Sequence, residues 1–593
     1  MIRITTLFFL SLLFLSSNAF SDGRFIQEYS TIKETGKITQ NTPIVYGNAE
    51  LRGGTYPLGT IPTGMTGFFD YVTNGNSIRD IQVFGDTIIC SWVLADSTDP
   101  TGMTSRKAYY TVSYDNGVSW LGAPIAVNSE RSAYPDITPY IGLVGRTIVL
   151  NGRAYDGSTS RGGVFSEALL GLGSLTQTYA PGMGRDYFAY KVAGTKIGGA
   201  YNVPTDDSLI YSAFDYSLGS FGSSMTIAGG STEIGASSRQ YVAASDDGNN
   251  VVVMWWFNDP SAIQNAMNYR VSSDGGNTFG AIQKWLLQGQ TFNGDSVTPW
   301  FGSDLVYKPG TNQFCAAANT LGFSGGAPNF GTREGYKLLF WSPSVNGGTP
   351  TVIADRSNFP SLSDTAIFNN LSAIQVGATA VSHPSLAYSD DGSTLYCLFS
   401  GVQPDTLDAF NYNDIYICRS TDDGATWTPP VNITNTADWD EMYPSIAKTG
   451  NTSTKINVVW QATKGPGCQS FTDLTPTYRV WQVYAKIDPQ TGGIINVNNI
   501  SSQVPEGFSL KQNYPNPFNP STSIRFELPK ANRVTLKVYD MSGKEVAILV
   551  KNEQVSAGLN EVVFNGSALA SGVYFYTLQA GDFKETKKMV LVK

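Results

Sequence analysis

Four arginines recur at the same place in successive parts of the sequence, each just before a short apolar β-run. They are Arg79, Arg131, Arg185 and Arg239. A guanidinium group binds a carboxylate or sulfate through two parallel hydrogen bonds, so arginines that converge on one site favour an acidic ligand. Tyr187 and Tyr241 follow two of the arginines and would line the same site. The competing interpretation is that each arginine pairs with a nearby carboxylate, such as Asp80, Glu130 or Asp186, on a solvated rim.

Few other residues stand in a pattern that indicates acid, base or nucleophilic chemistry. The single histidine, His383, precedes Pro384 where two other parts of the chain have Tyr134 and Tyr443 before a proline, so we expect it to fill an aromatic position of the structure. Tyr443 with Glu441 is a possible pair of nucleophile and base. One histidine and 5 cysteines without a CxxC pair exclude a multi-histidine metal centre and a zinc ribbon, and we expect no metal and no other cofactor.

A repeated turn motif must hold the β-runs together. The pattern Ser-x-Asp-x-Gly-x-Ser/Thr-aromatic occurs at residues 113–120, 272–279 and 420–427. In such a turn the aspartate accepts backbone N–H groups, the glycine takes a left-handed conformation, and the aromatic ring packs under the hairpin. We therefore assign a structural role to the motif residues, which are Ser113, Asp115, Gly117, Trp120, Ser272, Asp274, Gly276, Phe279, Ser420, Asp422, Gly424 and Trp427.

The turns belong to repeated units of four strands. In the clearest unit we expect strands at 384–388, 394–400, 414–420 and 426–431, and similar units begin near residues 78, 135, 187, 241, 301 and 444. Units of roughly 50–70 residues predict an all-β fold with a seven-bladed β-propeller at residues 76–495, and six blades are the alternative because the third and fifth units lack a good turn motif. The preceding segment, residues 20–75, can supply a closing strand. Cys90, Cys315 and Cys397 fall at equivalent positions of the repeat, and we expect them to be buried.

The turn motif in a propeller resembles the Asp-box of the sialidase superfamily, which includes members that are not sialidases. The resemblance implies that an arginine triad could bind the carboxylate of a sugar and that a tyrosine could act as nucleophile. The sequence also departs from sialidases, because no Arg-Ile-Pro motif stands near the start of the propeller and Arg52-Gly53-Gly54 does not replace it. Binding is therefore preferred to hydrolysis, and whether the protein is an enzyme stays open.

The beginning of the chain is typical of a secretory signal. Arg3 is followed by the apolar run 7–15, which is too short to span a bilayer, and small residues at 17 and 19 fit a cleavage site after Ala19. We expect residues 1–19 to be a signal peptide. No other stretch of the sequence is long and apolar enough to be a transmembrane segment.

The end of the chain is a separate unit. After an expected linker at 496–506, the sequence Asn513-Tyr514-Pro515-Asn516-Pro517 leads into alternating apolar and polar runs, which predict a small β-sandwich at 507–593. This segment closely resembles the C-terminal sorting domain, type A, of type IX secretion substrates. The resemblance implies the type IX machinery as partner, export through the periplasm, removal of the domain, and then release or attachment at the outer-membrane surface.

Composition narrows the remaining choices. The net charge is −9, which disfavours nucleic acid as a partner because both would be negative. We predict an exported cell-surface or secreted propeller that binds extracellular glycan or polymer at the mouth of its funnel, with an acidic glycan as the possible ligand. The alternatives are a sialidase-like glycoside hydrolase and a structural or adhesive surface protein.

Overall fold

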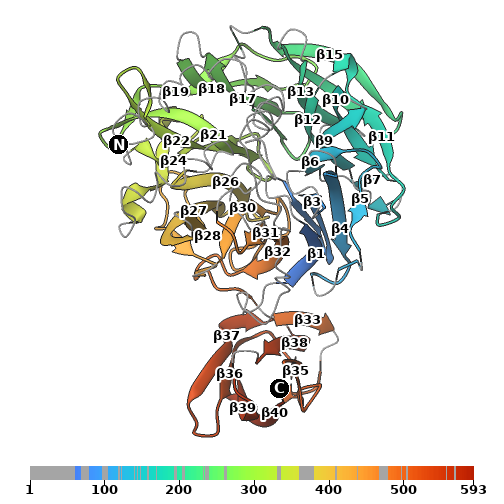
Figure 1. The fold of residues 1–593 in the computed structure, drawn as a ribbon, viewed down its shortest axis with the longest axis vertical. Coiled ribbons are helices and arrows are strands. Elements are labelled where there is room, and N and C mark those ends of the chain that lie inside the picture. Colours follow the sequence, from blue (N-terminus) through green and yellow to red (C-terminus); the bar gives the residue numbers. More distant parts are fainter. Residues whose placement is uncertain are drawn as a thin grey trace, which may run out of the picture.

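The computed structural model describes residues 61–592 apart from several short gaps and three longer ones, at 68–78, 360–378 and 467–478. Its main body is a ring of seven antiparallel sheets around a central axis, and two further sheets follow at the C-terminal end (Figure 1). The expected signal peptide, residues 1–19, and most of the segment 20–75 lie outside the described residues. In the described part of the chain, no helix combines the length and the apolar character needed to cross a membrane.

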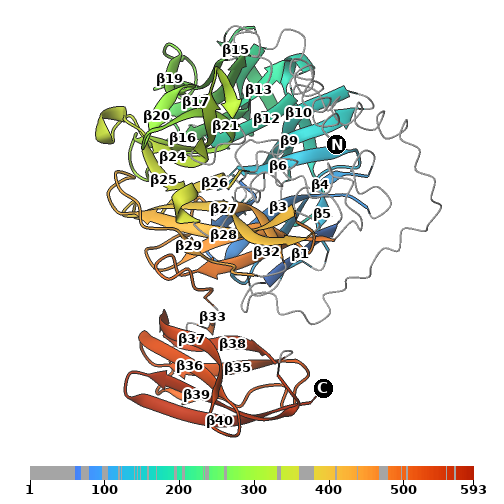
Figure 2. The same ribbon diagram turned by 60° about the vertical axis from the view of Figure 1, so that its left-hand side comes forward.

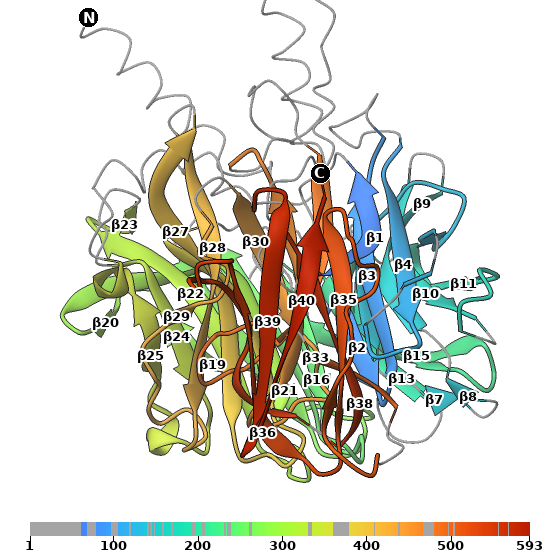
Figure 3. The same ribbon diagram turned by 90° about the horizontal axis from the view of Figure 1, so that it is seen from below.

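The seven sheets are the blades of a β-propeller, and each places one strand next to the axis. The inner strands are β2 (Ile81–Phe84), β6 (Ser132–Thr138), β12 (Arg185–Lys191), β16 (Gln240–Ala244), β21 (Asp295–Tyr307), β26 (Val381–Tyr388) and β30 (Asp440–Ile446). The second strands are β3 (Thr87–Leu94), β9 (Val149–Asp156), β13 (Lys196–Val203), β17 (Val251–Asp259), β22 (Phe314–Ser324), β27 (Leu395–Leu407) and β31 (Ile456–Thr463). Figure 3, which views the ring from its edge, shows several of these strands, such as β3, β22 and β27, running along the axis.

The outer half of each blade completes a four-stranded sheet. The third strands are β4 (Lys107–Ser113), β10 (Thr159–Ser166), β14 (Ser208–Asp215), β18 (Gln264–Ser272), β24 (Lys337–Trp341), β28 (Phe410–Ser420) and β32 (Val480–Ile487). The outermost strands are β5 (Ile125–Ala126), β11 (Thr176–Tyr179), β15 (Ser220–Ala228), β19 (Gln283–Leu287), β25 (Thr351–Asp355), β29 (Val431–Asn432) and β1 (Ile61–Gly67). Short additions are β20 (Gln290–Phe292), β23 (Ala327–Asn329) and the two-stranded β7 (Ile141–Gly142) and β8 (Gly145–Arg146).

The last blade combines strands from distant parts of the chain. β1 pairs with β32 in antiparallel register, with Ile61 opposite Tyr484 and Gly67 opposite Val480. The hydroxyl of Thr66 donates a hydrogen bond of 2.9 Å to the carbonyl of Val480. The N-terminal strand therefore joins three strands that lie more than 370 residues later in the sequence, and it closes the ring as a propeller requires.

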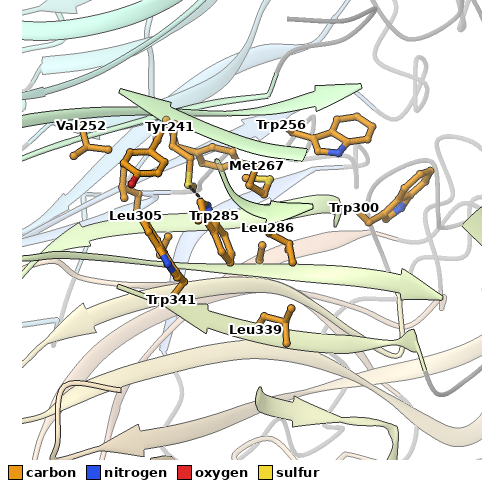
Figure 4. Packing of buried hydrophobic residues seen from close by; sticks show 14 of the residues in the cluster. Tyr241, Val252, Trp256, Met267, Trp285, Leu286, Trp300, Leu305, Leu339 and Trp341 are labelled. Carbon is orange, nitrogen blue, oxygen red and sulfur yellow. Dashed lines mark hydrogen bonds between the residues drawn. The ribbon is translucent and has the colours of Figure 1, made fainter. Parts of the chain in front are cut away.

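Neighbouring blades pack through apolar faces. Figure 4 shows the interface between the fourth and fifth blades, where Tyr241, Trp256, Trp285, Trp300 and Trp341 are buried together. The rings of Trp285 and Trp341 stack with centroids 5.4 Å apart, and the indole N–H of Trp285 donates to the sulfur of Met254. Such contacts bury the second strands β3, β17, β22 and β31 almost throughout.

The predicted burial of Cys90, Cys315 and Cys397 is confirmed by the structure. They lie on β3, β22 and β27, which are second strands of the first, fifth and sixth blades. A thiol in this position acts as a small apolar group, because both faces of a second strand are covered by neighbouring blades.

The C-terminal sheets form a β-sandwich. One sheet has the order β33 (Val497–Ser501), β38 (Gly558–Asn565), β35 (Ser521–Leu528) and β34 (Ser509–Leu510). The other has the order β37 (Glu545–Val555), β36 (Asn532–Tyr539), β39 (Gly572–Ala580) and β40 (Phe583–Leu591). Alternate residues of β35, β36, β38 and β39 point into a shared apolar core, as the period-2 pattern of the sequence predicted.

Two elements differ from the sequence-based expectation. The outer strand of the sixth blade was expected at 426–431, but only Val431–Asn432 forms a strand, because Asp422 holds the backbone N–H of Thr426 in the preceding turn at 2.9 Å. Residues 497–501 were expected in a linker at 496–506, but they form β33 and pair with β38. This pairing covers an edge of β38 whose N–H and C=O groups would otherwise lack strand partners.

Candidate functional site at the propeller axis

Several inner strands carry the same irregularity. β6, β26 and β30 each contain a β-bulge in which the residue before a proline has left-handed backbone, with φ of 53° at Tyr134, 53° at His383 and 55° at Tyr443. In β21 a bulge contains Gly302, with φ of 86°. A bulge bends its strand and re-aims a side chain. The predicted equivalence of His383 with the two tyrosines is therefore confirmed.

The bulge residues contact neighbouring blades. The rings of His383 and Tyr443 lie with centroids 4.6 Å apart, and both side chains are buried. The guanidinium group of Arg106 lies over the ring of Tyr134 at 5.4 Å. His383 thus fills an aromatic position in the contact between the sixth and seventh blades, and its Nδ1 lies 3.2 Å from the hydroxyl of Ser382.

Polar side chains just after the bulges link the inner strands around the axis. The inner edge of a blade has no strand partner, so its N–H groups need other acceptors. In three places a backbone N–H of one blade donates to a side chain of the blade before it. These bonds run from Leu386 N to Asp304 Oδ2 (2.7 Å), from Ile446 N to Ser385 Oγ (3.1 Å) and from Asp80 N to Ser445 Oγ (3.1 Å).

Arg79 lies at this axis and is 2% exposed. Its Nε donates to Asp136 Oδ1 at 2.7 Å, and a terminal nitrogen of the same guanidinium group bonds the other carboxylate oxygen. Nη1 reaches the carbonyl of Val242, so one side chain from the first blade joins the second and fourth blades. The expectation of a solvated rim is wrong for Arg79, because its ion-pair partner lies on the neighbouring blade inside the ring.

Lys448 is the second buried cation at the axis. Its ammonium group donates to Asp304 Oδ2 at 2.6 Å and to the carbonyl of Leu386 at 2.6 Å. The other carboxylate oxygen of Asp304 accepts the N–H of Leu305. One ion pair therefore satisfies donors and acceptors from the fifth, sixth and seventh blades.

Arg239 and Tyr241 come close to the same region. Arg239 is 6% exposed, and the side chain of Tyr241 is buried. Burial raises the pKa of Tyr241, while the nearby Arg239 lowers it and the nearby Asp304 raises it. The interpretation that Arg239 lies on a solvated rim is therefore wrong as well, because packing of the blades encloses its side chain.

Arg131 is partly exposed. Arg185 and Tyr187 lie on β12, where only the backbone is described. Their part in ligand binding stays a prediction.

We call six residues the axial cluster: Arg79, Asp80, Asp136, Arg239, Asp304 and Lys448. Burial raises the pKa of Asp80 well above its usual value, although the hydrogen bond from Ser91 opposes the rise. Burial also raises the pKa of Asp136, but its contacts with Arg79 oppose the rise. The axial cluster therefore brings three cations and three carboxyl groups together, and burial raises the pKa of two of these acids, Asp80 and Asp136.

A second group of titratable residues lies between the sixth and seventh blades. The hydroxyl of Thr436 is 2.9 Å from both carboxylate oxygens of Glu441 and 3.4 Å from Asp414 Oδ1. A hydroxyl has one proton and cannot donate to both acids at once. Burial raises the pKa of Glu441 and of Asp414, and the nearby charge of Asp414 raises that of Glu441 further. The carboxyl pair therefore retains a proton at a pH where an exposed acid has lost it.

The carboxyl pair was not predicted, because its members are 27 positions apart and belong to no motif; Glu441 was considered only with Tyr443. The sequence held one signal that could have found the pair, because Glu441 is an acidic residue at the start of the inner strand β30. Within the described residues, no group of three or more His, Cys, Asp or Glu side chains is arranged to hold a metal ion.

The Asp-boxes lie at the opposite end of the propeller. In the second box, Asp274 Oδ1 accepts the backbone N–H of Thr278 at 2.8 Å, and Ser272 Oγ accepts that of Gly276 at 2.9 Å. Hydrogen bonds lower the pKa of Asp274 to about 2, and the bond from the side chain of Thr278 has the largest effect. The backbone N–H of Asn116 in the first box bonds the carbonyl of Asp86, in the hairpin between the first and second strands. The first Asp-box therefore lies beside this hairpin.

Comparison with known proteins identifies the C-terminal unit. Residues 512–593 match the family described as the secretion system C-terminal sorting domain. This match covers the β-sandwich from just before β35 to the end of the chain. The protein is therefore secreted or attached to the outer-membrane surface, and its sorting domain interacts with the type IX secretion machinery.

The propeller is similar to several solved structures that have low sequence identity to it. An α-L-arabinofuranosidase, Arb93A from Fusarium graminearum, is 13% identical over 60% of this chain and 97% of its own, with a TM-score of 0.36. An α-L-arabinanase from Penicillium chrysogenum is 15% identical over 60% and 98%, with a TM-score of 0.37. The polysaccharide lyase Uly1 is 10% identical over 75% and 95%, with a TM-score of 0.42. A comparison with curated sequences finds no match. None of these likenesses assigns a function to this chain.

Proposed function

We propose that the exported protein binds an acidic extracellular polysaccharide at the mouth of the propeller. By the mouth we mean the end of the axis at which the inner strands begin. The observation that supports the proposal most is that the guanidinium group of Arg79, from the first blade, reaches the carbonyl of Val242 on the fourth blade, where Arg239 lies near Tyr241. Uronate, sulfate and sialate sugars are the ligand classes that such a site favours.

Electrostatics explains why an anionic sugar would bind there. The axial cluster brings three cations together, and low-dielectric walls strengthen the attraction of a buried charge for an anion. Arg79 is bound to Asp136 and holds the blades together, so we assign it a positioning role. Arg239 and the partly exposed Arg131 are the arginines that we expect to contact the ligand.

Replacement of these two arginines tests the proposal. Arg239→Ala and Arg131→Ala should each weaken binding of an acidic polysaccharide about 10–100-fold, because a charge-assisted hydrogen bond contributes roughly 1.5–3 kcal/mol. Isothermal titration with a polyuronate measures the change, and the affinity should fall as salt rises. Lys284→Ala is the matched control, since Lys284 is an exposed cation on β19 of the same blade as Arg239.

Folding must be separated from binding in this experiment. Arg239→Lys keeps the charge in the enclosed site and should bind more tightly than Arg239→Ala, and the urea midpoint of each variant reports its stability. Unchanged affinity of both alanine variants, or a preference of the wild type for neutral sugars, would contradict the proposed site.

Glycoside hydrolysis is the second candidate, and the carboxyl pair Asp414–Glu441 favours it. Cleavage of a glycosidic bond needs two carboxyl groups that flank the bond about 5–9.5 Å apart, one of them protonated, and the raised pKa of Glu441 suits the role of the acid. If the pair acts in hydrolysis, Glu441→Gln should lower the release of reducing ends from the same polysaccharide by at least about 100-fold while binding persists. Hydrolysis is eliminated as a candidate if the wild type releases no reducing ends, or if the wild type and Glu441→Gln release them at equal rates.

A further inference from the structure

Exposed apolar side chains are concentrated in the sorting domain. Nine large hydrophobic residues are exposed in the described part of the chain, and five of them fall within the 82 residues 512–593. These five are Tyr514, Met541, Ile548, Val563 and Val592. Scattered exposed apolar residues are normal, but a concentration of them marks an interaction surface.

Three of these residues lie at one end of the sandwich. Tyr539 is opposite Phe575, so the turn that carries Met541 comes next to the beginning of β39. Gly572 of that strand is opposite Leu591, at the end of β40 and beside Val592. A bridge between Phe518 and Leu591 brings the loop after Tyr514 to the same place. The C-terminus marks this end of the sandwich in Figure 2.

The backbone under Tyr514 is firmly held, although its side chain is 81% exposed. Tyr514 and Ser523 exchange two backbone hydrogen bonds, of 2.9 and 3.0 Å. The side chain of the preceding Asn513 donates to the hydroxyl of Thr522 at 2.9 Å. An aromatic ring presented on a fixed backbone loses little entropy when it enters a pocket, which is the property of a binding hot spot.

The charge of this end indicates the chemistry of its partner. Residues 512–593 contain ten Lys and Arg against seven Asp and Glu, a net charge of +3, whereas the whole chain has −9. Lys544 and Lys588 are exposed, and they flank the turn of Met541 and the end of β40. A protein that fits this end would offer an apolar pocket with carboxylates around it.

We propose that Tyr514, Met541 and Val592, flanked by Lys544 and Lys588, form the surface by which a receptor protein of the secretion machinery binds this chain. Tyr514 enters an apolar pocket of the receptor, and the lysines pair with acidic residues at the rim of that pocket. The sorting match identifies the partner as an export protein, and the exposure and charge of these residues identify the face of the sandwich that it contacts.

Export of the full-length protein in its native host tests this surface. Tyr514→Ala should reduce the amount outside the cell about tenfold or more, with the protein retained in the periplasm, since loss of a hot spot costs at least 1.4 kcal/mol. Lys588→Glu should reduce export in the same direction. Leu218→Ala is the matched control, because Leu218 is 74% exposed on the propeller and should leave export unchanged.

The urea midpoint of each purified variant should equal that of the wild type, because the side chain of Tyr514 packs against little of the protein. Tyr514→Phe keeps the ring and should restore export, which a mere folding defect of the alanine variant would not predict. Normal export of Tyr514→Ala, an equal defect in Leu218→Ala, or a dimer of the protein that depends on Tyr514 would each overturn the proposal.

Discussion

Asp304→Ala is expected to lower the free energy of unfolding by about 3–5 kcal/mol, the usual cost of removing one member of a buried ion pair. Lys448 lies 2.6 Å from Asp304 and both side chains are almost inaccessible to solvent, so the substitution leaves a buried ammonium group without its carboxylate. The backbone N–H groups of Leu305 and Leu386 lose their acceptor at the same time.

Urea unfolding of the propeller measures this effect. Asp423→Ala is the matched control, because Asp423 forms an ion pair of 2.8 Å with Lys308 at a partly exposed position, where a pair contributes about 0–1 kcal/mol. The double variant Asp304→Leu with Lys448→Met should recover most of the loss, since no charge is then left buried. A loss below about 1 kcal/mol for Asp304→Ala would contradict the role of this pair at the axis.

Gly424→Ala should be destabilising by about 2–4 kcal/mol, because left-handed strain and a steric clash act together. Gly424 is the glycine of the third Asp-box and has φ of 93°. A Cβ at this position would lie 2.2 Å from Cε1 of Phe340, on the third strand of the preceding blade. The ring of Phe340 is buried and cannot move without opening the contact between the blades.

Gly219→Ala separates the two causes. Gly219 is in a hairpin of the third blade with φ of 62°, and a Cβ there would meet no atom within 4 Å. Its variant should therefore show only the strain, about 1–2 kcal/mol. Equal losses for the two variants, measured as urea midpoints, would show that the Asp-box glycine makes no close contact with the neighbouring blade.

The same contact occurs at all three Asp-boxes. The box aromatics Trp120, Phe279 and Trp427 each pack edge-to-face or nearly so on a ring of the preceding blade, with centroids 5.0–5.5 Å apart. The sequence predicted the turn itself, because serine, aspartate and glycine interact over a few residues. It could not predict the ring beneath the box: Tyr484 packs against the first box from more than 360 positions further along the chain.

Other features were predictable from the sequence where they depend on neighbouring residues, and were not where they depend on residues far apart in the chain. The repeat of strand and turn predicted the blades and the equivalence of His383 with Tyr134 and Tyr443, since each signal lies within a few residues. The burial of Arg79 was not predictable, because its partner Asp136 is 57 positions away and the two meet only when the blades pack around the axis. The outer strand of the sixth blade was misplaced because the turn of Asp422 uses residues with high strand propensity.

The central claim is that the mouth of the propeller binds an acidic polysaccharide through the negative charge of the polysaccharide. Titration of the wild-type protein with a polyuronate, and with the same polymer after reduction of its carboxyl groups to alcohols, tests this claim directly. We expect the native polymer to bind at least about tenfold more tightly at low salt, with the difference narrowing as salt rises. Equal affinity for the two polymers, or tighter binding of the reduced one, would contradict the claim.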